Sequence, residues 1–287
     1  MEDKAKMVKN KRVLTIQDIS CLGQCSLTVA LPIISACGVE TVILPSAVLS
    51  THTGGFTGYT FTDLTDDIPK IMEHWVKSEQ KFDCIYTGYL GSITQIDYVS
   101  ELIDNVLVEG ALKIIDPAMA DNGSLYYGFN EEFVKNMAKL CGKADVVLPN
   151  ITEAAFMTGI EYKAEGHDEA YIMTLLQGLK KLGAKKAVLK GISYEPGRIG
   201  VAVYDCVNDE LQYYFTEKVP KSSHGTGDCY ASAFTGAVMQ GKNDLEAASL
   251  AADFVVSSIK KTIDDDDHWY GVKFEQALPM LVRELNK

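Results

Sequence analysis

Short apolar runs alternate along the chain with longer stretches in which apolar residues recur every three or four positions. The helix-like stretches lie at 66–79, 95–108, 131–140 and 168–182, and another begins after Gly23 and ends near Gly38. The apolar runs are RVLTIQD (12–18), TVILP (41–45), FDCIYTGYLG (82–91), LKIIDPAM (112–119), DVVLPN (145–150) and KAVLKG (186–191). Because alternating strands and helices favour parallel pairing, we predict an α/β fold with a central, mostly parallel sheet and helices on both faces.

One segment departs from this alternation. GRIGVAVYDCVNDELQYYFTEKV (197–219) contains two alternating strands around Asn208-Asp209, which predicts an antiparallel hairpin at an edge of the sheet. Farther along the chain, NDLE (243–246) has the pattern of a capping box and predicts the start of another helix. The chain has no linker, repeat or low-complexity segment, so we expect a single domain over residues 1–287.

The segment SSHGTGDCYASAFTGAVMQG (222–241) predicts a helix of small and apolar residues that stops at Gly241. Its front end is unusual, because Gly225 and Gly227 leave backbone N–H groups bare at a helix N-terminus, where the helix dipole favours an anion. Two interpretations of Asp228 follow. Its carboxylate either complements the helix dipole or acts as a base beside a bound phosphate.

Polar residues close the predicted parallel strands, and in such a sheet ligands bind at the carboxyl ends of the strands. The residues expected at this edge are Asp18, Thr87 to Tyr89, Asp116, Asn150 with Glu153, Lys190 with Gly191, and the turn from Gly225 to Asp228. Taken singly, some have simpler explanations: Asp116 precedes a proline and fits a turn, and Asn150 fits a helix cap. Their joint placement on one edge indicates a ligand site.

Composition and charge narrow the classes of function. The 287 residues are 47% apolar and carry a formal net charge of −12, whereas nucleic-acid binding usually needs a basic footprint. No stretch approaches the roughly 20 apolar residues of a membrane span, and no apolar segment typical of a secretory signal follows the basic N-terminus. We therefore expect neither a nucleic-acid nor a membrane partner. The acidic run Asp264–Asp267 cannot turn all its carboxylates toward one ion, so we interpret it as a solvated loop rather than a metal site.

Cysteine usage bears on the compartment. The seven cysteines are scattered, and no C-x-x-C pair occurs. An odd number without a disulfide framework indicates reduced thiols and a cytoplasmic protein. We interpret each cysteine as a small buried hydrophobic residue.

GTGD (225–228) and several further segments resemble the pyridoxal kinase family of the ribokinase-like small-molecule kinases. GTGD at the start of a helix is similar to the anion-hole and catalytic-base motif of the whole superfamily. Segments specific to vitamin B6 kinases occur in the family's order, from residue 12 to about residue 260: LTIQDISCLG, LSTHTGGFTGY, TGYLGS, DPAMADNG and LPNITEA. The hydroxymethylpyrimidine kinases are the nearest relatives of this family.

The resemblance implies a ribokinase-like three-layer fold and ATP-dependent phosphorylation of the 5′-hydroxymethyl group of pyridoxal, pyridoxine or pyridoxamine. It implies that Asp228 is the base that accepts the hydroxyl proton, and that the amides of Gly225, Thr226 and Gly227 hold the transferred phosphoryl group. Phosphoryl transfer depends mainly on positioning and charge stabilisation, and such a turn supplies both. ATP and Mg²⁺ are the implied cofactors, a monovalent cation is a further candidate, and members of the family are commonly homodimers.

The remaining candidate residues match ligand contacts of the family. Those implied for the nucleotide side are Asp116 and Glu153 near magnesium and phosphate, Asn150 beside phosphate, and Lys190 with Gly191 along the nucleotide. Those implied for the substrate pocket are Asp18, His52, Thr53 and Tyr89, the last against the pyridine ring. A structural role for His52 stays equally open.

Two departures from the family pattern bear on the substrate. Asp18 stands where family members carry a serine that contacts the ring, and a carboxylate there would favour a cationic partner such as the aminomethyl group of pyridoxamine. Alternatively, Asp18 caps the following turn. The pair Ser223-His224 before the turn is similar to the corresponding segment of the hydroxymethylpyrimidine kinases, although those enzymes have a cysteine where Asp228 stands. A hydroxymethylpyrimidine kinase and a non-catalytic vitamer-binding protein are therefore the two alternatives to a B6 kinase.

Overall fold

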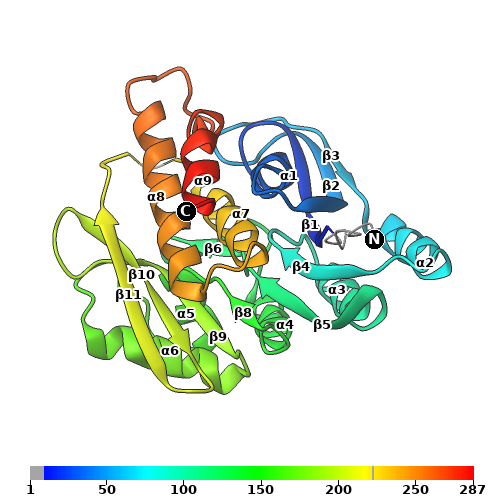
Figure 1. Ribbon diagram of the computed structural model, residues 1–287, viewed down its shortest axis with the longest axis horizontal. Helices are drawn as coiled ribbons and strands as arrows, with labels where there is room; N and C mark the ends of the chain where they lie inside the picture. The colour runs from blue at the N-terminus through cyan, green and yellow to red at the C-terminus, as the bar shows by residue number, and fades with distance from the viewer. Residues whose placement is uncertain (1–9, 222) are drawn as a thin grey trace, which may run out of the picture.

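The structure is a computed structural model that describes residues 10–221 and 223–287. The basic N-terminal residues 1–9, and Ser222 at the start of the helix motif, lie outside the described residues. A nine-stranded sheet has the order β11-β10-β9-β8-β5-β4-β1-β2-β3 (Figure 1). Its strands are β1 (Arg12–Leu22), β2 (Glu40–Thr51), β3 (Phe61–Asp63), β4 (Phe82–Thr87), β5 (Leu107–Ile115), β8 (Val146–Val147), β9 (Lys186–Ile192), β10 (Arg198–Asp205) and β11 (Glu210–Glu217). A separate ribbon pairs β6 (Ala120–Asp121) with β7 (Ser124–Leu125).

The centre of the sheet is parallel and its edges are antiparallel. β2, β1, β4, β5, β8 and β9 pair in parallel, in that order. β3 lies antiparallel to β2 at one edge, and β10 and β11 form an antiparallel hairpin next to β9 at the other. The predicted edge hairpin around Asn208-Asp209 is confirmed.

Helices cover both faces of the sheet. They are α1 (Leu27–Ala36), α2 (Ile68–Lys77), α3 (Ile93–Val106), α4 (Glu131–Cys141), α5 (Ile151–Thr158), α6 (Glu169–Leu182), α7 (Thr226–Met239), α8 (Asp244–Thr262) and α9 (Leu278–Leu285), with 3₁₀ turns η1 (Thr65–Asp67) and η2 (Phe274–Gln276). One hydrophobic core lies between the sheet and α2 to α6, and a second lies between the sheet and α1, α7, α8 and α9 (Figure 1). The predicted three-layer α/β fold is confirmed.

Alternation of side chains along the central strands decides which residues reach the start of α7. In β5, Ile114 packs in the core beneath α1, α7 and α8, whereas Ile115 packs in the core on the opposite face. In β9, Val188 shares the face of Ile114. Because side chains alternate along a strand, Asp116 and Lys190 are directed to this same face, two positions beyond Ile114 and Val188. The sheet therefore turns both side chains toward the layer that contains α7.

Local signals set the helix boundaries in this layer. Asn243 caps α8, since its Oδ1 accepts from the Glu246 backbone N–H at 3.0 Å, while Glu246 Oε2 accepts from the Asn243 N–H at 2.9 Å. This is the capping box that NDLE predicts. After α7 ends, Gly241 adopts a φ of 93°, a left-handed conformation that glycine takes without strain.

The strand β1 is longer than the sequence pattern predicts. Its pairing with β4 ends at Ile16, whereas its pairing with β2 continues to Leu22. Asp18 therefore lies inside β1, so the prediction that it closes the strand is wrong, and so is its interpretation as the cap of a following turn. The run 19–22 extends the strand because β2 also extends and supplies a hydrogen-bonding partner. Asp18 still lies just beyond the last β1–β4 pair, at the edge of the central sheet.

Two further predictions concern the acidic run Asp264–Asp267 and the absence of membrane-spanning helices. Asp265 forms an ion pair with Lys273, while Asp264, Asp266 and Asp267 are exposed, as expected of a solvated loop. No helix in the described ranges has the length and apolar character needed to cross a membrane. The division of the chain into one domain stays a prediction.

Candidate active site

The carboxyl ends of β5 and β9 meet at a buried ion pair. Lys190 Nζ lies 2.7 Å from Asp116 Oδ2, and the two side chains are 13% and 5% exposed. Burial raises the pKa of Asp116, and the Lys190 ammonium opposes that rise. Burial alone would lower the pKa of Lys190, but the Asp116 and Glu153 carboxylates outweigh it and raise that pKa overall. Lys190 is therefore a cation at neutral pH, a local positive charge in an acidic protein.

Asp228 is the third residue of α7, and the charges of Asp116, Asp18 and Lys190 act on its carboxyl group. Its Oδ2 accepts a hydrogen bond from the Ser26 backbone N–H at 2.9 Å. Burial raises the pKa of Asp228 to about 7, and the two other carboxylates add to the rise, against the Ser26 N–H and Lys190, which lower it. A carboxyl with a pKa near neutrality can both accept and release a proton, which is what a general base requires.

The turn before Asp228 is shaped by its first glycine. Gly225 has a φ of 74°, and a Cβ there would lie 1.7 Å from the Gln24 carbonyl oxygen. Only glycine fits such a position. The backbone N–H groups of Gly227 and Asp228 have no acceptor within residues 10–221 and 223–287. A Cβ on Gly227 would meet nothing within 4 Å, so unpartnered amides at a helix N-terminus lie beside open space, where an anion can bind.

Asn150 and Glu153 form a reciprocal capping box at the start of α5. Asn150 Oδ1 accepts from the Glu153 N–H at 2.8 Å, and Glu153 Oε2 accepts from the Asn150 N–H at 2.8 Å. Glu153 Oε1 accepts from the Met119 N–H at 3.2 Å, and Asn150 Nδ2 donates to the Ala120 carbonyl at 2.9 Å. The interpretation of Asn150 as a helix cap is confirmed. The sequence NITE (150–153) has the same N-x-x-E pattern as NDLE, a signal that could have identified this box.

The carboxylates of Asp116 and Glu153 fit the donor set that magnesium prefers. Mg²⁺ in phosphate-binding sites is usually held by one or two carboxylates, and phosphate oxygens and waters complete its shell. Burial raises the pKa of Glu153 to about 8, and the charge of Asp116 adds to this rise. Two buried carboxylates that repel one another would be stabilised by a cation. No group of three or more His, Cys, Asp or Glu side chains suited to a metal occurs in the part of the chain that the structure describes.

Asp18 and Tyr89, two of the residues predicted for the substrate pocket, lie close enough for the Asp18 charge to act on Tyr89. Asp18 is buried, and its Oδ2 accepts from the Ser20 hydroxyl at 2.9 Å. Burial raises the pKa of Asp18 above its ordinary value, although the nearby hydrogen bonds oppose the rise. Tyr89 stacks on Phe129 with ring centroids 5.6 Å apart. Burial, with a further contribution from the Asp18 charge, raises the pKa of Tyr89 to about 12, so its hydroxyl is neutral.

His52 and Thr53 lie in the loop that follows β2. His52 Nδ1 accepts from the Gly54 N–H at 3.0 Å, so Nε2 carries the hydrogen and donates to the Tyr270 carbonyl at 2.8 Å. Both ring nitrogens are thus used by the backbone, and burial lowers the pKa of His52. This geometry is that of a structural histidine, the second of the two readings of this residue. Thr53 is exposed.

Five of the predicted charged residues lie close together at the sheet edge, since their charges shift the pKa values of Lys190 and Asp228. They are Asp18, Asp116, Glu153, Lys190 and Asp228. Gly191 follows Lys190 with a φ of 82° and is exposed. Three contacts were missed from the sequence: the Ser26 N–H on Asp228, Gln24 behind Gly225, and the Tyr270 carbonyl on His52. Each joins segments far apart in the chain, and no motif signals it.

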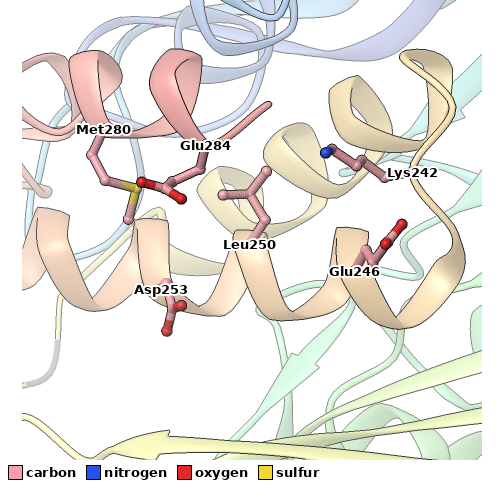
Figure 2. A pocket seen from close by; sticks show the side chains of 6 residues that line it. All are labelled: Lys242, Glu246, Leu250, Asp253, Met280 and Glu284. Atoms are coloured by element: carbon pink, nitrogen blue, oxygen red, sulfur yellow. The ribbon is translucent and has the colours of Figure 1, made fainter. Parts of the chain in front are cut away.

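A groove of about 510 Å³ is lined mainly by side chains of α8 and α9 (Figure 2). Its lining side chains are Lys242, Glu246, Leu250, Asp253, Met280 and Glu284. Lys242 follows the C-terminal end of α7, whereas Asp228 lies at the N-terminal end of that helix. The groove is therefore not part of the candidate active site.

A three-layer α/β fold with a helix start suited to an anion, beside a buried carboxyl whose pKa is raised, fits a small-molecule kinase. Residues 31–272, more than half of the chain, match the family model described as phosphomethylpyrimidine kinase. The chain therefore belongs to the phosphomethylpyrimidine kinase family.

Individual relatives carry two kinds of name. A Bacteroides thetaiotaomicron protein described as a phosphomethylpyrimidine kinase, solved with pyridoxal, is 37% identical, with a TM-score of 0.89 over 95% of this chain and 96% of that one. Pyridoxal kinase from Lactobacillus plantarum is 30% identical, with a TM-score of 0.87 over 95% and 97% of the two chains. A hydroxymethylpyrimidine/phosphomethylpyrimidine kinase of Staphylococcus aureus is 25% identical over 89% of this chain and 90% of its own length. The resemblance to the pyridoxal kinases of the ribokinase-like superfamily is confirmed, and the chain is a kinase of this family.

Proposed function

We propose that this kinase transfers the γ-phosphoryl group of ATP to the 5′-hydroxymethyl group of a B6 vitamer, which is pyridoxal, pyridoxine or pyridoxamine. The observation that carries the proposal is the position of Asp228, a carboxyl with a pKa near 7 at the start of α7 that responds to the charges of Asp116 and Lys190. The choice of alcohol is supported by the pyridoxal in the Bacteroides structure and by the name of the Lactobacillus relative.

In this mechanism Asp228 accepts the hydroxyl proton while the alcohol oxygen forms a bond to the γ-phosphorus. The bond from that phosphorus to the β,γ-bridging oxygen breaks, and ADP leaves. The backbone amides of Gly225, Thr226 and Gly227 donate hydrogen bonds to the transferred phosphoryl group. Lys190 adds a fixed positive charge where negative charge accumulates, the kind of preorganised stabilisation on which phosphoryl transfer depends.

On the nucleotide side, Asp116 and Glu153 would hold Mg²⁺, directly or through water, and the ion would neutralise phosphate charge. Asn150 would lie beside a phosphate, and Lys190 with Gly191 would follow the nucleotide. On the vitamer side, Tyr89 would pack against the pyridine ring, and Asp18 and Thr53 would contact its polar groups. We assign His52 to the wall of the pocket, because both its ring nitrogens are occupied by backbone groups.

A second candidate is a hydroxymethylpyrimidine kinase. The name of the Staphylococcus relative favours it, and so does His224 directly before the GTGD turn. Asp228 favours a B6 kinase instead, because the hydroxymethylpyrimidine kinases that this chain resembles have a cysteine at the corresponding position. A protein that only bound a vitamer would need no anion-binding turn beside a base.

One assay separates these functions. Pyridoxal, pyridoxine, pyridoxamine and hydroxymethylpyrimidine are each incubated with Mg-ATP, and the phosphate ester is quantified, with Asp228→Asn as the inactive control. We expect B6 esters to form at the highest kcat/KM. Preferential hydroxymethylpyrimidine phosphate would support the second candidate, and no ester from any alcohol would support a binding protein.

We also propose that the kinase is a homodimer, as its relatives commonly are. Light scattering at assay concentration should then report about twice the chain mass of 31.5 kDa. A mass equal to that of one chain would contradict the proposal.

A further inference from the structure

One partly buried cationic contact lies four residues before the GTGD turn. Lys221 Nζ donates to three backbone carbonyl oxygens: those of Thr262 at 3.0 Å, Ile263 at 3.3 Å and Asp265 at 3.3 Å. Thr262 is the last residue of α8, so these carbonyls lie at the negative end of a helix dipole, where a cation is stabilised. An ammonium group has three donors, and all three have an acceptor here.

The Ile263 and Asp265 carbonyls belong to the loop between α8 and η2, residues 263–273, which we call the clasp loop. Its farther half contacts the loop between β1 and α1. His268 Nε2 donates to Gln24 Oε1 at 2.9 Å, and the Gln24 N–H donates to the Tyr270 carbonyl at 3.4 Å. Gly271 allows this approach, since a Cβ there would lie 2.6 Å from Gln24 Cβ.

The clasp loop also contacts the loop after β2, on the proposed vitamer side. The Tyr270 carbonyl accepts from His52 Nε2 at 2.8 Å, and Trp269 packs on Phe56 with ring centroids 4.5 Å apart. A Cβ on Gly55 would lie 2.8 Å from the Trp269 ring. The clasp loop therefore touches two separate loops of the candidate site.

The contact with Gln24 leads to the catalytic carboxyl. The Gln24 carbonyl lies against Gly225, and two residues farther on the Ser26 N–H donates to Asp228. Ser26 holds a φ of 56°, which costs free energy in a residue other than glycine and persists only where the surroundings impose it.

We propose that Lys221 is a positioning residue for phosphoryl transfer: its ammonium fixes the start of the clasp loop, and the clasp loop holds the Gln24–Ser26 segment that orients Asp228. The ammonium acts in this carbonyl cage as a bound cation would. The inference rests on the proposed function, which makes Asp228 the base, whereas the contacts themselves are independent of the substrate.

The test compares Lys221→Met, which keeps the aliphatic stem and removes the charge, with Lys261→Met. Lys261 is an exposed lysine in the last turn of α8. Kinetics are measured with whichever alcohol the wild type phosphorylates. Because small displacements of reacting groups cost up to about a hundredfold, we expect Lys221→Met to lower kcat by about 10- to 100-fold with little change in KM, and Lys261→Met to leave both unchanged.

Two further measurements separate positioning from general loss of stability. Amide hydrogen exchange without substrate should rise in residues 23–26 and 263–271 of Lys221→Met and stay at the wild-type level in Lys261→Met. In Lys221→Ala, added methylammonium should restore part of kcat, whereas tetramethylammonium, which has no N–H donor, should not.

The outcomes are distinct from those that test the proposed function. If the wild type phosphorylates no B6 vitamer, the proposed function fails, and the exchange comparison still decides the role of Lys221. Unchanged exchange in Lys221→Met, a kcat equal to that of the wild type, or equal rescue by both ammonium ions would each overturn the positioning role.

Discussion

The Ser26 backbone N–H donates a 2.9 Å hydrogen bond to Asp228 Oδ2 across 202 positions of sequence. Ser26 adopts φ 56° and ψ −134°, a conformation that is unusual for a residue with a side chain. Such strain persists where the surrounding structure over-determines it, and it clusters at functional sites. The hydrogen bond orients one carboxylate oxygen of Asp228, and in the function proposed above the other would accept the proton of the substrate hydroxyl.

Asp228→Asn removes the proposed base and keeps the acceptor for Ser26. We expect binding of both substrates to persist while kcat falls by about 10²–10⁴-fold, the usual contribution of a general base. That loss corresponds to roughly 3–5 kcal/mol of barrier. Steady-state kinetics and nucleotide-binding titrations on the same preparation measure the two effects, and Asp104→Asn, an exposed site on α3, is the matched control. Turnover comparable to that of the wild type would exclude Asp228 as the base.

The pH profile of the wild type should reflect the ionisation of the same carboxyl. Burial raises the pKa of Asp228 to about 7, and only the ionised form can accept a proton. The value of kcat/KM should therefore fall as pH drops below about 7 and level off above it, since this ratio reports ionisations of the free enzyme. A profile measured from pH 5 to pH 9 that stays flat between 5 and 7 would contradict the assignment.

The stability of the wild type should fall over the pH range in which its activity rises, and Asp228→Asn should not share this fall. An acid whose pKa is raised on folding costs stability when it ionises: the cost is absent below its ordinary pKa of about 3.9 and complete above about 7. The asparagine variant escapes this cost, so we expect it to exceed the wild type by on the order of 1–3 kcal/mol at pH 8. The gain should shrink as pH falls from 7 toward 4. Denaturant unfolding at pH 4.5 and pH 8, without ligands, measures it, and an equal gain at both values would refute the idea.

Gly225 and Gly227 should respond differently to alanine. A Cβ on Gly225 would meet the Gln24 carbonyl at 1.7 Å at a φ of 74°, so Gly225→Ala should destabilise the fold by a few kcal/mol. A Cβ on Gly227 meets nothing within 4 Å, so Gly227→Ala should keep its melting temperature. Its methyl group would enter the space proposed for the phosphoryl group, and its kcat should fall. Equal stability of both variants, or full activity of Gly227→Ala, would count against this geometry.

Much of the site could be predicted because simple rules fix the direction of side chains in a parallel sheet. Strand ends meet at one edge, and alternation along β5 and β9 turns Asp116 and Lys190 to the face where α7 begins. Gly225 is required by the backbone and Gly227 leaves the space beside it open, so the GTGD pattern alone marks the start of α7 as a candidate anion site.

The rest of the site depends on contacts that have no periodic signature. The Ser26 N–H reaches Asp228 through an unusual backbone conformation, which sequence patterns do not encode. In the sequence Lys221 cannot be told from an ordinary surface lysine, and only the fold brings it to the C-terminal end of α8. Asp18 was expected at a strand end because the pattern RVLTIQD stops there, whereas pairing with β2 continues the strand to Leu22.

The last prediction concerns the choice of vitamer by Asp18. This carboxyl is buried, and the Ser20 hydroxyl that donates a hydrogen bond to it is an uncharged donor. Because burial raises the pKa of Asp18, a cationic group of the ligand would stabilise its ionised form. Charge-assisted hydrogen bonds are about twice as strong as neutral ones, so a preference of about 1–2 kcal/mol for a cationic partner, or around tenfold, is expected.

We therefore expect Asp18→Ser to lower kcat/KM for pyridoxamine about tenfold more than for pyridoxal, because the aminomethyl cation loses its partner while the aldehyde loses none. Asp18→Asn, which keeps the shape of the side chain without its charge, should give the same selective loss, and Ser20→Ala should not. Both substrates are measured on all four proteins under one set of conditions. If the Asp18 variants change the two kcat/KM values by one common factor, Asp18 does not select the amine, and the carboxylate acts on the pocket as a whole.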